Sequence, residues 1–380
     1  MKQGIKYILA AASVFFFTFE AYSQKVDLNG QFAGWLTVSH SDNTYIQPGL
    51  RFVPQLTFSV PVSAKFKFDC ELSADGFYNY TSISDTAGYG YRKARLYRAW
   101  LRFSGDRFEI RAGLQKINFG SANILRPLMW FDRVDPRDPL KLTTGVYGLL
   151  GKYYFRNNAN IWVWSLLGNK ETTGWETVPS SQWRPEFGGR IQLPIPKGEI
   201  AFSYHNREAR FADGSQPAID GNRYFNENRY AIDAKADLGI GLWIEGSITH
   251  RTGRYLPEFE KAVTAGADYT IGLGQGLNII AENMFVSTSQ SIAATSNSIN
   301  MTGLSVSLPL SIITRATVII FYDWKDNGWY NFANLSFTFN KTSINIIGFD
   351  NPESFSLLNF SAGRNIFAGY GGQVMMVYNF

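Results

Sequence analysis

Hydrophobic and polar residues alternate with a period of two along most of the chain. Residues 65–72 (KFKFDCEL) alternate strictly, and residues 50–60, 229–238 and 332–340 follow the same pattern. In an extended strand, successive side chains point to opposite faces, so this period is typical of strands with one apolar and one polar face. The pattern therefore predicts a chain built almost entirely of β-strands.

Short and long connections between these strands also alternate. Short turns are predicted at 61–64, 104–106, 156–159, 194–198, 239–241, 272–276, 308–311 and 340–342. Long polar stretches lie between them at 76–92, 119–146, 169–186, 207–228, 251–260, 287–299 and 351–371, with shorter ones near 39–47 and 325–328. This rhythm is typical of a membrane barrel with short periplasmic turns and long extracellular loops.

The turns give a strand count. Eight short turns join eight hairpins, and one further strand is expected at each end, over 26–38 and 372–380. We predict an all-β fold, a transmembrane antiparallel barrel of 16–18 strands with 18 favoured, because 354–361 fits either a loop or a strand. A barrel of this size leaves a channel. A soluble β-protein shows the same alternation and is the alternative.

The first residues have the features of an export signal. A basic start with Lys2 and Lys6 precedes an apolar run, and small residues Ala21 and Ser23 come before a predicted cleavage site. We predict a signal peptide over 1–23 and one barrel over 24–380, with a retained anchor helix as the alternative. We expect the protein to be exported to the bacterial outer membrane.

Composition bears on the possible disulfides, partners and cofactors of the protein. Aromatic residues make up 16% of the chain, and its single cysteine excludes an intrachain disulfide. A formal net charge of +5 indicates little about partners. We expect contacts with outer-membrane lipids and lipopolysaccharide, no nucleic acid, no cofactor and no metal.

Two neighbouring predicted strands carry basic polar faces. Arg98, Trp100 and Arg102 share a face of the first strand, and Arg107, Glu109 and Arg111 share a face of the second. Charges facing lipid cost about 2–4 kcal/mol near the bilayer midplane, so these residues should line the lumen. Rows of guanidinium groups guide anions. Alternatively, Glu109 and other acids neutralise them and they only brace the wall.

The stretch 124–140 (ILRPLMWFDRVDPRDPL) combines charges, aromatics and three prolines. Its candidate site residues are Arg126, Trp130, Asp132, Arg133, Asp135, Arg137 and Asp138. The aspartate spacing differs from that of a calcium loop, and the interleaved arginines would pair with the carboxylates first. Trp130 and Phe131 either stack on a sugar or anchor the loop, and we favour anchoring.

Catalytic chemistry has little support in the sequence. The three histidines, His40, His205 and His250, have no recognisable serine or paired aspartate setting nearby. We therefore predict that the protein is not an enzyme, with an outer-membrane hydrolase as a weaker alternative.

Two segments resemble known exported barrels. The final strand, ending in Tyr378 and Phe380, looks like the assembly signal of outer-membrane barrels, which implies recognition by the barrel assembly machinery. The second segment, residues 111–140, resembles the strand-and-loop signature of the alginate-export-like and related porin families. Its matching residues are Gly113, Gln115, Phe119, Gly120, Asp135, Pro136, Asp138 and Pro139. The chain departs from that pattern at Leu114 and in its short length, so alginate itself is not implied.

This resemblance implies that the third outside loop, 119–146, folds into the barrel and constricts it. We expect Asp132, Asp135 or Asp138 to bind wall arginines, while Arg126, Arg133 or Arg137 face the pore. The sequence thus predicts a porin for passive diffusion of small hydrophilic solutes, with a modest preference for anions and possible homo-oligomers or larger membrane complexes. A closed barrel serving as an accessory or scaffold of a secretion or uptake complex is the alternative.

Overall fold

The described part of the chain is made of strands, turns and loops. The computed structural model describes residues 25–84, 86–211, 223–253, 256–352 and 367–380. The predicted signal peptide and residues 354–361 lie outside these ranges. Within them, no helix has the length and apolar character needed to cross a membrane.

The described residues form 18 strands. The first nine are β1 (Lys25–His40), β2 (Thr44–Pro61), β3 (Lys67–Ile83), β4 (Thr86–Ser104), β5 (Phe108–Gln115), β6 (Val146–Tyr154), β7 (Asn160–Leu166), β8 (Glu186–Ile195) and β9 (Gly198–Arg210). The others are β10 (Tyr224–Asp237), β11 (Gly241–Arg251), β12 (Phe259–Ile271), β13 (Leu277–Ser289), β14 (Asn297–Pro309), β15 (Thr314–Asp323), β16 (Gly328–Phe339), β17 (Thr342–Asn351) and β18 (Gly369–Asn379).

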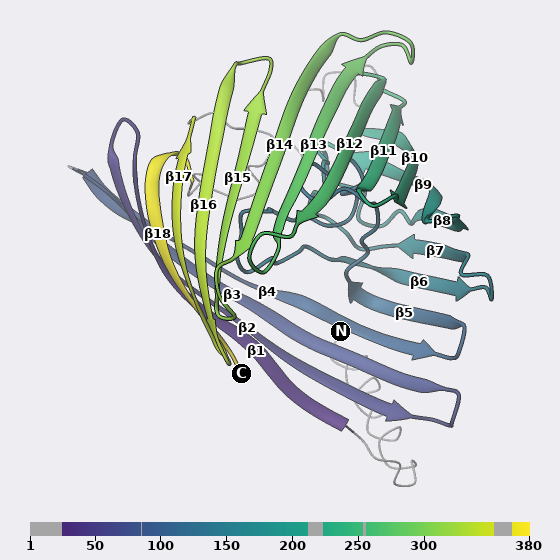
Figure 1. Ribbon diagram of the computed structural model, residues 1–380. Coiled ribbons are helices and arrows are strands. Elements are labelled where there is room, and N and C mark those ends of the chain that lie inside the picture. The colour runs from purple at the N-terminus through teal and green to yellow at the C-terminus, as the bar shows by residue number, and fades with distance from the viewer. Residues whose placement is uncertain (1–24, 85, 212–222, 254–255, 353–366) are drawn as a thin grey trace.

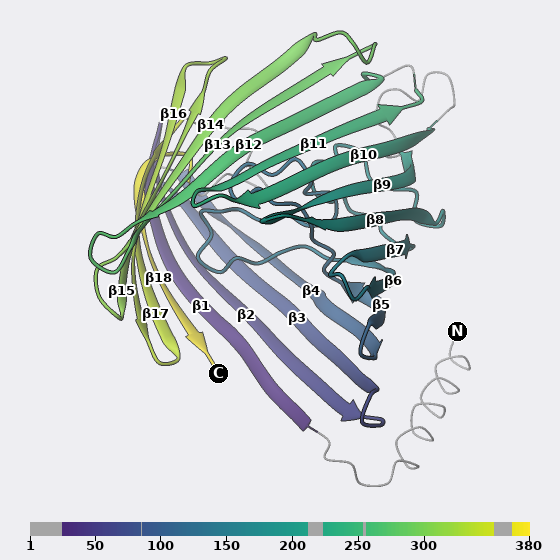
Figure 2. The ribbon, with the colours of Figure 1, turned by 45° about the vertical axis from the view of Figure 1, so that its right-hand side comes forward.

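These strands close into one antiparallel barrel (Figures 1 and 2). Each strand pairs with its neighbours in sequence, and β1 pairs with β18 from Gln31↔Asn379 to His40↔Tyr370. Closure gives every strand two hydrogen-bonded neighbours, so no sheet edge is left open. The predicted all-β barrel with 18 strands is confirmed.

The eight predicted short turns lie between β2 and β3, β4 and β5, and so on around one rim of the barrel. One predicted long loop is wrong. Residues 76–92 are largely strand, because β3 runs to Ile83 and β4 begins at Thr86. Tyrosines lie on the outward face of these strand ends, as at Tyr78 and Tyr80, and polar residues such as Thr81 on the inward face, so the apolar–polar alternation is lost.

The outer face of the barrel is apolar. On β2 alone, Ile46, Leu50, Phe52 and Leu56 are each 42–49% exposed. Aromatic rings lie near the long-loop ends of some strands, as in the Tyr322–Trp329 pair at 4.6 Å where β15 ends and β16 begins. A soluble protein rarely exposes so large a continuous apolar surface. An apolar band flanked by aromatics is the outer surface of a barrel that lies in lipid.

Candidate functional site

The long connection between β5 and β6 lies inside the barrel. We call this segment, residues 116–145, the insert. It makes hydrogen bonds to β11 and β13, which are six and eight strands away from β5 in an 18-strand ring. Those strands are on the far side of the ring, so the insert crosses the interior (Figure 2).

Two glutamates on the far wall hold the insert through its backbone. Glu245 on β11 accepts the amides of Ala122 at 2.6 Å and Leu128 at 3.4 Å. Glu282 on β13 accepts the three amides of residues 123–125 at 2.6, 2.9 and 2.5 Å. Both side chains are buried. We call Glu245 and Glu282 the carboxylate clamp. It supplies acceptors to buried amides that no strand partner satisfies.

Gly120 is required where the insert enters the clamp. Its φ is +102°, and a Cβ there would lie 2.3 Å from Oε1 of Glu245. Glycine adopts positive φ without the steric cost that other residues meet. Gly120 therefore permits both the turn and the approach of the carboxylate.

Trp130 and Phe131 anchor the insert to the near wall. They are 3% and 1% exposed. Phe131 meets the ring of Trp164 on β7 edge-on at 5.5 Å, and Phe119 stacks on the same indole at 5.8 Å. Both rings are buried in this cluster, and Trp130 also lines the small cavity described below.

A second apolar cluster joins the insert to the opposite wall. Ile124 and Leu125 pack among inward-facing residues of β13–β17, including Met284, Met301 and Phe321. Lumen walls are usually polar in barrels of this kind. The apolar patch on this wall is covered by the insert and by Phe367, whose ring meets those of Phe332 and Phe349.

The charged residues at 126–138 bind groups within the insert or in the next loop. Asp132 receives Arg126 at 3.4 Å, and Asp135 binds Arg137 through two bonds of 2.9 and 2.8 Å. Arg133 donates to the carbonyl of Gly174 at 2.9 Å and to the hydroxyl of Thr172 at 3.1 Å. Asp138 accepts the amide of Leu140 at 2.9 Å.

These contacts differ from two expectations for Asp132, Asp135, Arg126 and Arg137. The insert is held by wall glutamates acting on its amides, whereas Asp132 and Asp135 bind arginines of the insert itself. Arg126 and Arg137 are 8% and 3% exposed, so they do not face an open pore. Backbone amides carry no sequence signature, so alternation could not reveal them as the contacting groups.

Burial shifts the pKa of two groups in the insert. It raises the pKa of the Asp138 carboxyl to about 6, with the nearby Asp135 adding to the rise. The Leu140 amide and Arg51 act in the opposite direction. Burial also lowers the pKa of the Arg133 guanidinium.

The residues of the predicted basic faces have two kinds of surroundings: Arg98 binds the insert, whereas Arg102 and Arg111 lie around Trp100. Arg98 is buried and donates to the carbonyl and hydroxyl oxygens of Thr143 at 3.2 and 2.7 Å, so it holds the end of the insert. Trp100 lies between Arg102 and Arg111, whose guanidinium carbons are 5.7 and 4.7 Å from its ring centre. Arg107 lies in the turn before β5.

Glu109 forms ion pairs with several of these cations. Its carboxylate lies 3.6 Å from Arg102, 3.7 Å from Arg111 and 3.2 Å from Lys152, and Asp69 is a second partner of Arg102 at 2.8 Å. The side chains of Arg102 and Arg111 remain 28% and 17% exposed.

A larger charge cluster lies on β9–β12, where the sequence shows only scattered arginines on polar faces. Arg207, Arg229 and Arg251 surround Glu227 at 2.7, 2.6 and 2.8 Å. Two further carboxylates complete the cluster. Glu176, from loop 167–185, lies 2.9 Å from Arg229, and Glu260 lies 2.8 Å from Arg251. Three arginines thus face three glutamates, and the cluster is close to neutral.

A cavity of about 180 Å³ lies between this charge cluster and the insert. Pro127 and Trp175 line one side, and Arg229, Thr249 and Arg251 line the other. Ala262, Met284 and Val286 of the wall and Glu176 of loop 167–185 also line the cavity, so its lining mixes apolar and polar side chains.

The histidine most open to a catalytic interpretation is sealed. His205 has no exposed surface, receives the Trp164 indole at 3.2 Å and lies 3.0 Å from Glu186. His250 lies 3.2 Å from Glu258 near the end of β11. A substrate has no access to the imidazole of His205.

The architecture has known counterparts. OccK2 of Pseudomonas aeruginosa aligns over 94% of this chain and 98% of its own, with a TM-score of 0.60 and 10% identity. OccAB1 of Acinetobacter baumannii aligns over 95% and 96%, with a TM-score of 0.55 and 9% identity. OmpT of Vibrio cholerae, an outer-membrane protein in its trimer form, aligns over 94% and 100%, with a TM-score of 0.52 and 9% identity.

The chain has the fold of the outer-membrane porins. At 9–10% identity, this likeness concerns the fold alone. No protein-family model and no curated protein matches the sequence. The predicted porin-type barrel is confirmed, and the roles assigned to single residues stay predictions.

Proposed function

We propose that the protein is an outer-membrane channel for passive diffusion of small hydrophilic solutes, constricted by the insert. The observation that carries this proposal is the clamp: a segment rooted between β5 and β6 is bound to β11 and β13 across the interior. A closed barrel with a lipid-facing apolar surface supports placement in the membrane. The sealed environment of His205 supports a non-enzymatic role.

A modest anion preference is part of this proposal. Near the short-turn rim, the five cations Lys67, Arg102, Arg107, Arg111 and Lys152 outnumber the four carboxylates of Asp69, Glu71, Asp106 and Glu109. The excess of positive charge attracts anions at that mouth of the barrel. The neutral cluster on β9–β12 adds little to it, so we expect a preference and not exclusive selectivity.

Planar-bilayer recording tests the channel. Purified protein should insert and carry an ohmic current, and its reversal potential in a KCl gradient should show a modest preference for chloride. Insertion without current contradicts the channel, and cation selectivity contradicts the charge assignment.

A closed accessory barrel is the second candidate. It is favoured by the two apolar clusters that fix the insert to both walls. The same recording separates the two candidates, because a closed barrel inserts and stays silent.

A further inference from the structure

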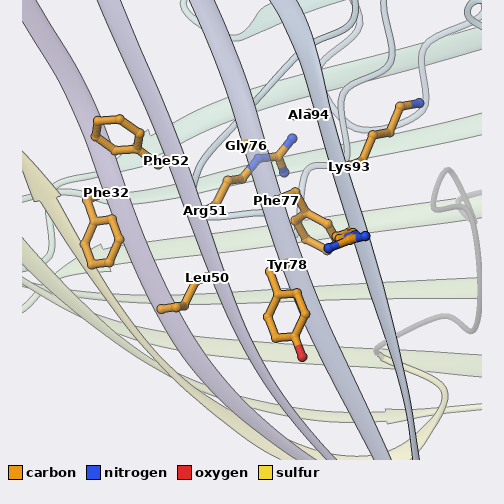
Figure 3. Close-up of a pocket in the computed structure, with 10 residues that line it drawn as sticks. Phe32, Leu50, Arg51, Phe52, Gly76, Phe77, Tyr78, Lys93 and Ala94 are labelled. Carbon is orange, nitrogen blue, oxygen red and sulfur yellow. The ribbon is translucent and has the colours of Figure 1, made fainter.

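A groove crosses the outer face of the barrel over β1–β4. The strand register aligns Phe32 with Phe52, Phe52 with Gly76, and Gly76 with Ala94. Two large rings are thus followed by two positions with almost no side chain. The resulting hollow has a volume of about 530 Å³, and Figure 3 shows Phe32, Phe52 and Tyr78 around it.

The groove needs an apolar occupant. Phe32, Leu50 and Phe52 are 44%, 49% and 46% exposed and form much of its lining. An unfilled hollow would leave these side chains without contacts on one side, which forfeits dispersion energy. The flexible apolar material that surrounds such a wall is the acyl chain of a lipid.

Polar groups stand directly beside the groove. The next row of outward residues joins Leu50, Tyr78 and Arg92 across three strands. Further along β4 toward the short-turn rim, the outward residues are apolar, from Ala94 to Phe103. A lipid-facing arginine costs about 2–4 kcal/mol at the midplane and about 0–1 near the interface, so Arg92 marks the level of the headgroups.

Tyr78 adds a second donor at that level. Its ring extends over β4, where a Cβ on Gly90 would lie 3.4 Å from the tyrosine hydroxyl. In the part of the chain that the structure describes, neither this hydroxyl nor the Arg92 guanidinium has a hydrogen-bond or ion-pair partner. Both donors are exposed and point away from the lumen, as the pairing of Tyr78 with Arg92 requires.

We propose that this groove binds one phosphorylated lipid of the outer leaflet. Its acyl chain lies over Gly76 and Ala94, and its phosphate accepts hydrogen bonds from the Arg92 guanidinium and the Tyr78 hydroxyl. Arginine suits phosphate because its planar donors make paired, charge-assisted hydrogen bonds. The inference requires only that the barrel lies in a membrane. It is therefore independent of whether the barrel conducts.

Two pairs of variants separate the groove from the rest of the lipid-facing wall. Gly76→Leu fills the hollow without strain, because a Cβ there meets nothing nearer than 3.8 Å. Gly348→Leu is its control on β17, where a Cβ meets nothing within 4 Å. Arg92→Gln removes the phosphate contact, and Arg210→Gln changes another exposed arginine near the long-loop end of β9.

The test is native mass spectrometry of delipidated, refolded protein. Each protein is titrated with a bisphosphorylated glucosamine-disaccharide lipid and with its dephosphorylated counterpart, after heat-modifiable gel mobility has shown that the barrel is folded. We expect one tightly bound phosphorylated lipid per barrel and at least tenfold weaker binding of the dephosphorylated one. Arg92→Gln should weaken phosphorylated-lipid binding about tenfold, and Gly76→Leu should abolish binding of both lipids. The two controls should bind as the parent does.

Several results overturn the proposal. Equal binding of the two lipids would show that the phosphate is not recognised. Equal binding by Arg92→Gln and Arg210→Gln would show that Arg92 does not bind it. Unchanged lipid binding by Gly76→Leu would show that the groove is not the binding site. If Gly76→Leu instead converts an oligomer to monomers while lipid binding is unchanged, the groove is a contact between copies of the chain.

Discussion

Single residues fix the path of the insert. Gly120 supplies a backbone conformation that other residues resist, and Glu245 and Glu282 supply acceptors for amides that have left the sheet. Trp130 and Phe131 fill the space beside Trp164. Each of these residues acts by positioning the insert. The effect of substituting one of them should therefore be measured first on the order of the insert.

The first prediction concerns Gly120. Gly120→Ala should loosen the insert, since positive φ costs a residue with a Cβ about 1–2 kcal/mol and the Cβ also displaces Glu245. We expect faster proteolysis of the insert and noisier current. Gly348→Ala, at an open lipid-facing position, is the control. Equal protease resistance of the two variants would contradict the role of Gly120.

The second prediction concerns Asp138. Its folded pKa of about 6 lies above the ordinary value, so the folded state takes up a proton before the unfolded state does. The stability of the insert should therefore rise as pH falls through about 6 and level off near pH 4. Asp138→Asn should remove this change and protect the insert at pH 7. Hydrogen exchange of insert amides between pH 4 and 7.5 measures it, and identical profiles would exclude Asp138 as the titrating group.

At the scale of elements, the insert and the wall form one unit. The near end is held by the aromatic cluster on β6 and β7, and the far side by the carboxylate clamp and the apolar patch on β13–β17. A hydrogen bond to a charged group contributes about 1.5–3 kcal/mol, and the clamp makes several. The insert should thus behave as a fixed wall of the channel.

The third prediction tests the clamp. Glu282→Gln removes the charge from three short hydrogen bonds and directs an amide donor toward backbone N–H groups. The insert should detach roughly ten times more often, which follows from a loss of about 1.4 kcal/mol. Single-channel recording should show higher or fluctuating conductance. Glu171→Gln, at a side chain that is 65% exposed, is the control. Unchanged conductance and unchanged protease sensitivity would show that the clamp does not limit the pore.

At the scale of the whole molecule, the charge distribution is uneven. The cluster on β9–β12 balances three arginines with three glutamates, whereas the short-turn mouth near β4–β6 has an excess of cations. Selectivity should therefore depend on the mouth more than on the larger cluster.

The fourth prediction follows from this difference. Replacing Arg102 and Arg111 together with Ala should reduce the anion preference to near zero, because both side chains are partly exposed at the mouth. Reversal potentials in a KCl gradient measure the effect. A matched change of Arg184, which is 70% exposed in loop 167–185, should leave the potential unchanged. An undiminished anion preference in the Arg102/Arg111 variant would place its source elsewhere.

The sequence by itself determined the strands, the eight short turns and the barrel. A strand between lipid and a lumen must alternate, and a barrel of antiparallel strands must alternate its connections. These are local rules, so they appear in local patterns. The rule failed at 76–92, where aromatic and polar residues lie on both faces of the strand ends, so apolar and polar positions no longer alternate.

Only the tertiary structure decided what holds the insert and which charges are balanced. The sequence marks residues 119–146 as rich in aromatics, prolines and charges, and it favours an anchoring role for Trp130. It does not show that Glu245 and Glu282, more than 100 positions away, lie opposite the amides of residues 122–125. Such contacts depend on how the ring of strands brings distant positions together. They involve backbone groups that every residue carries, so no pattern of residue types can reveal them.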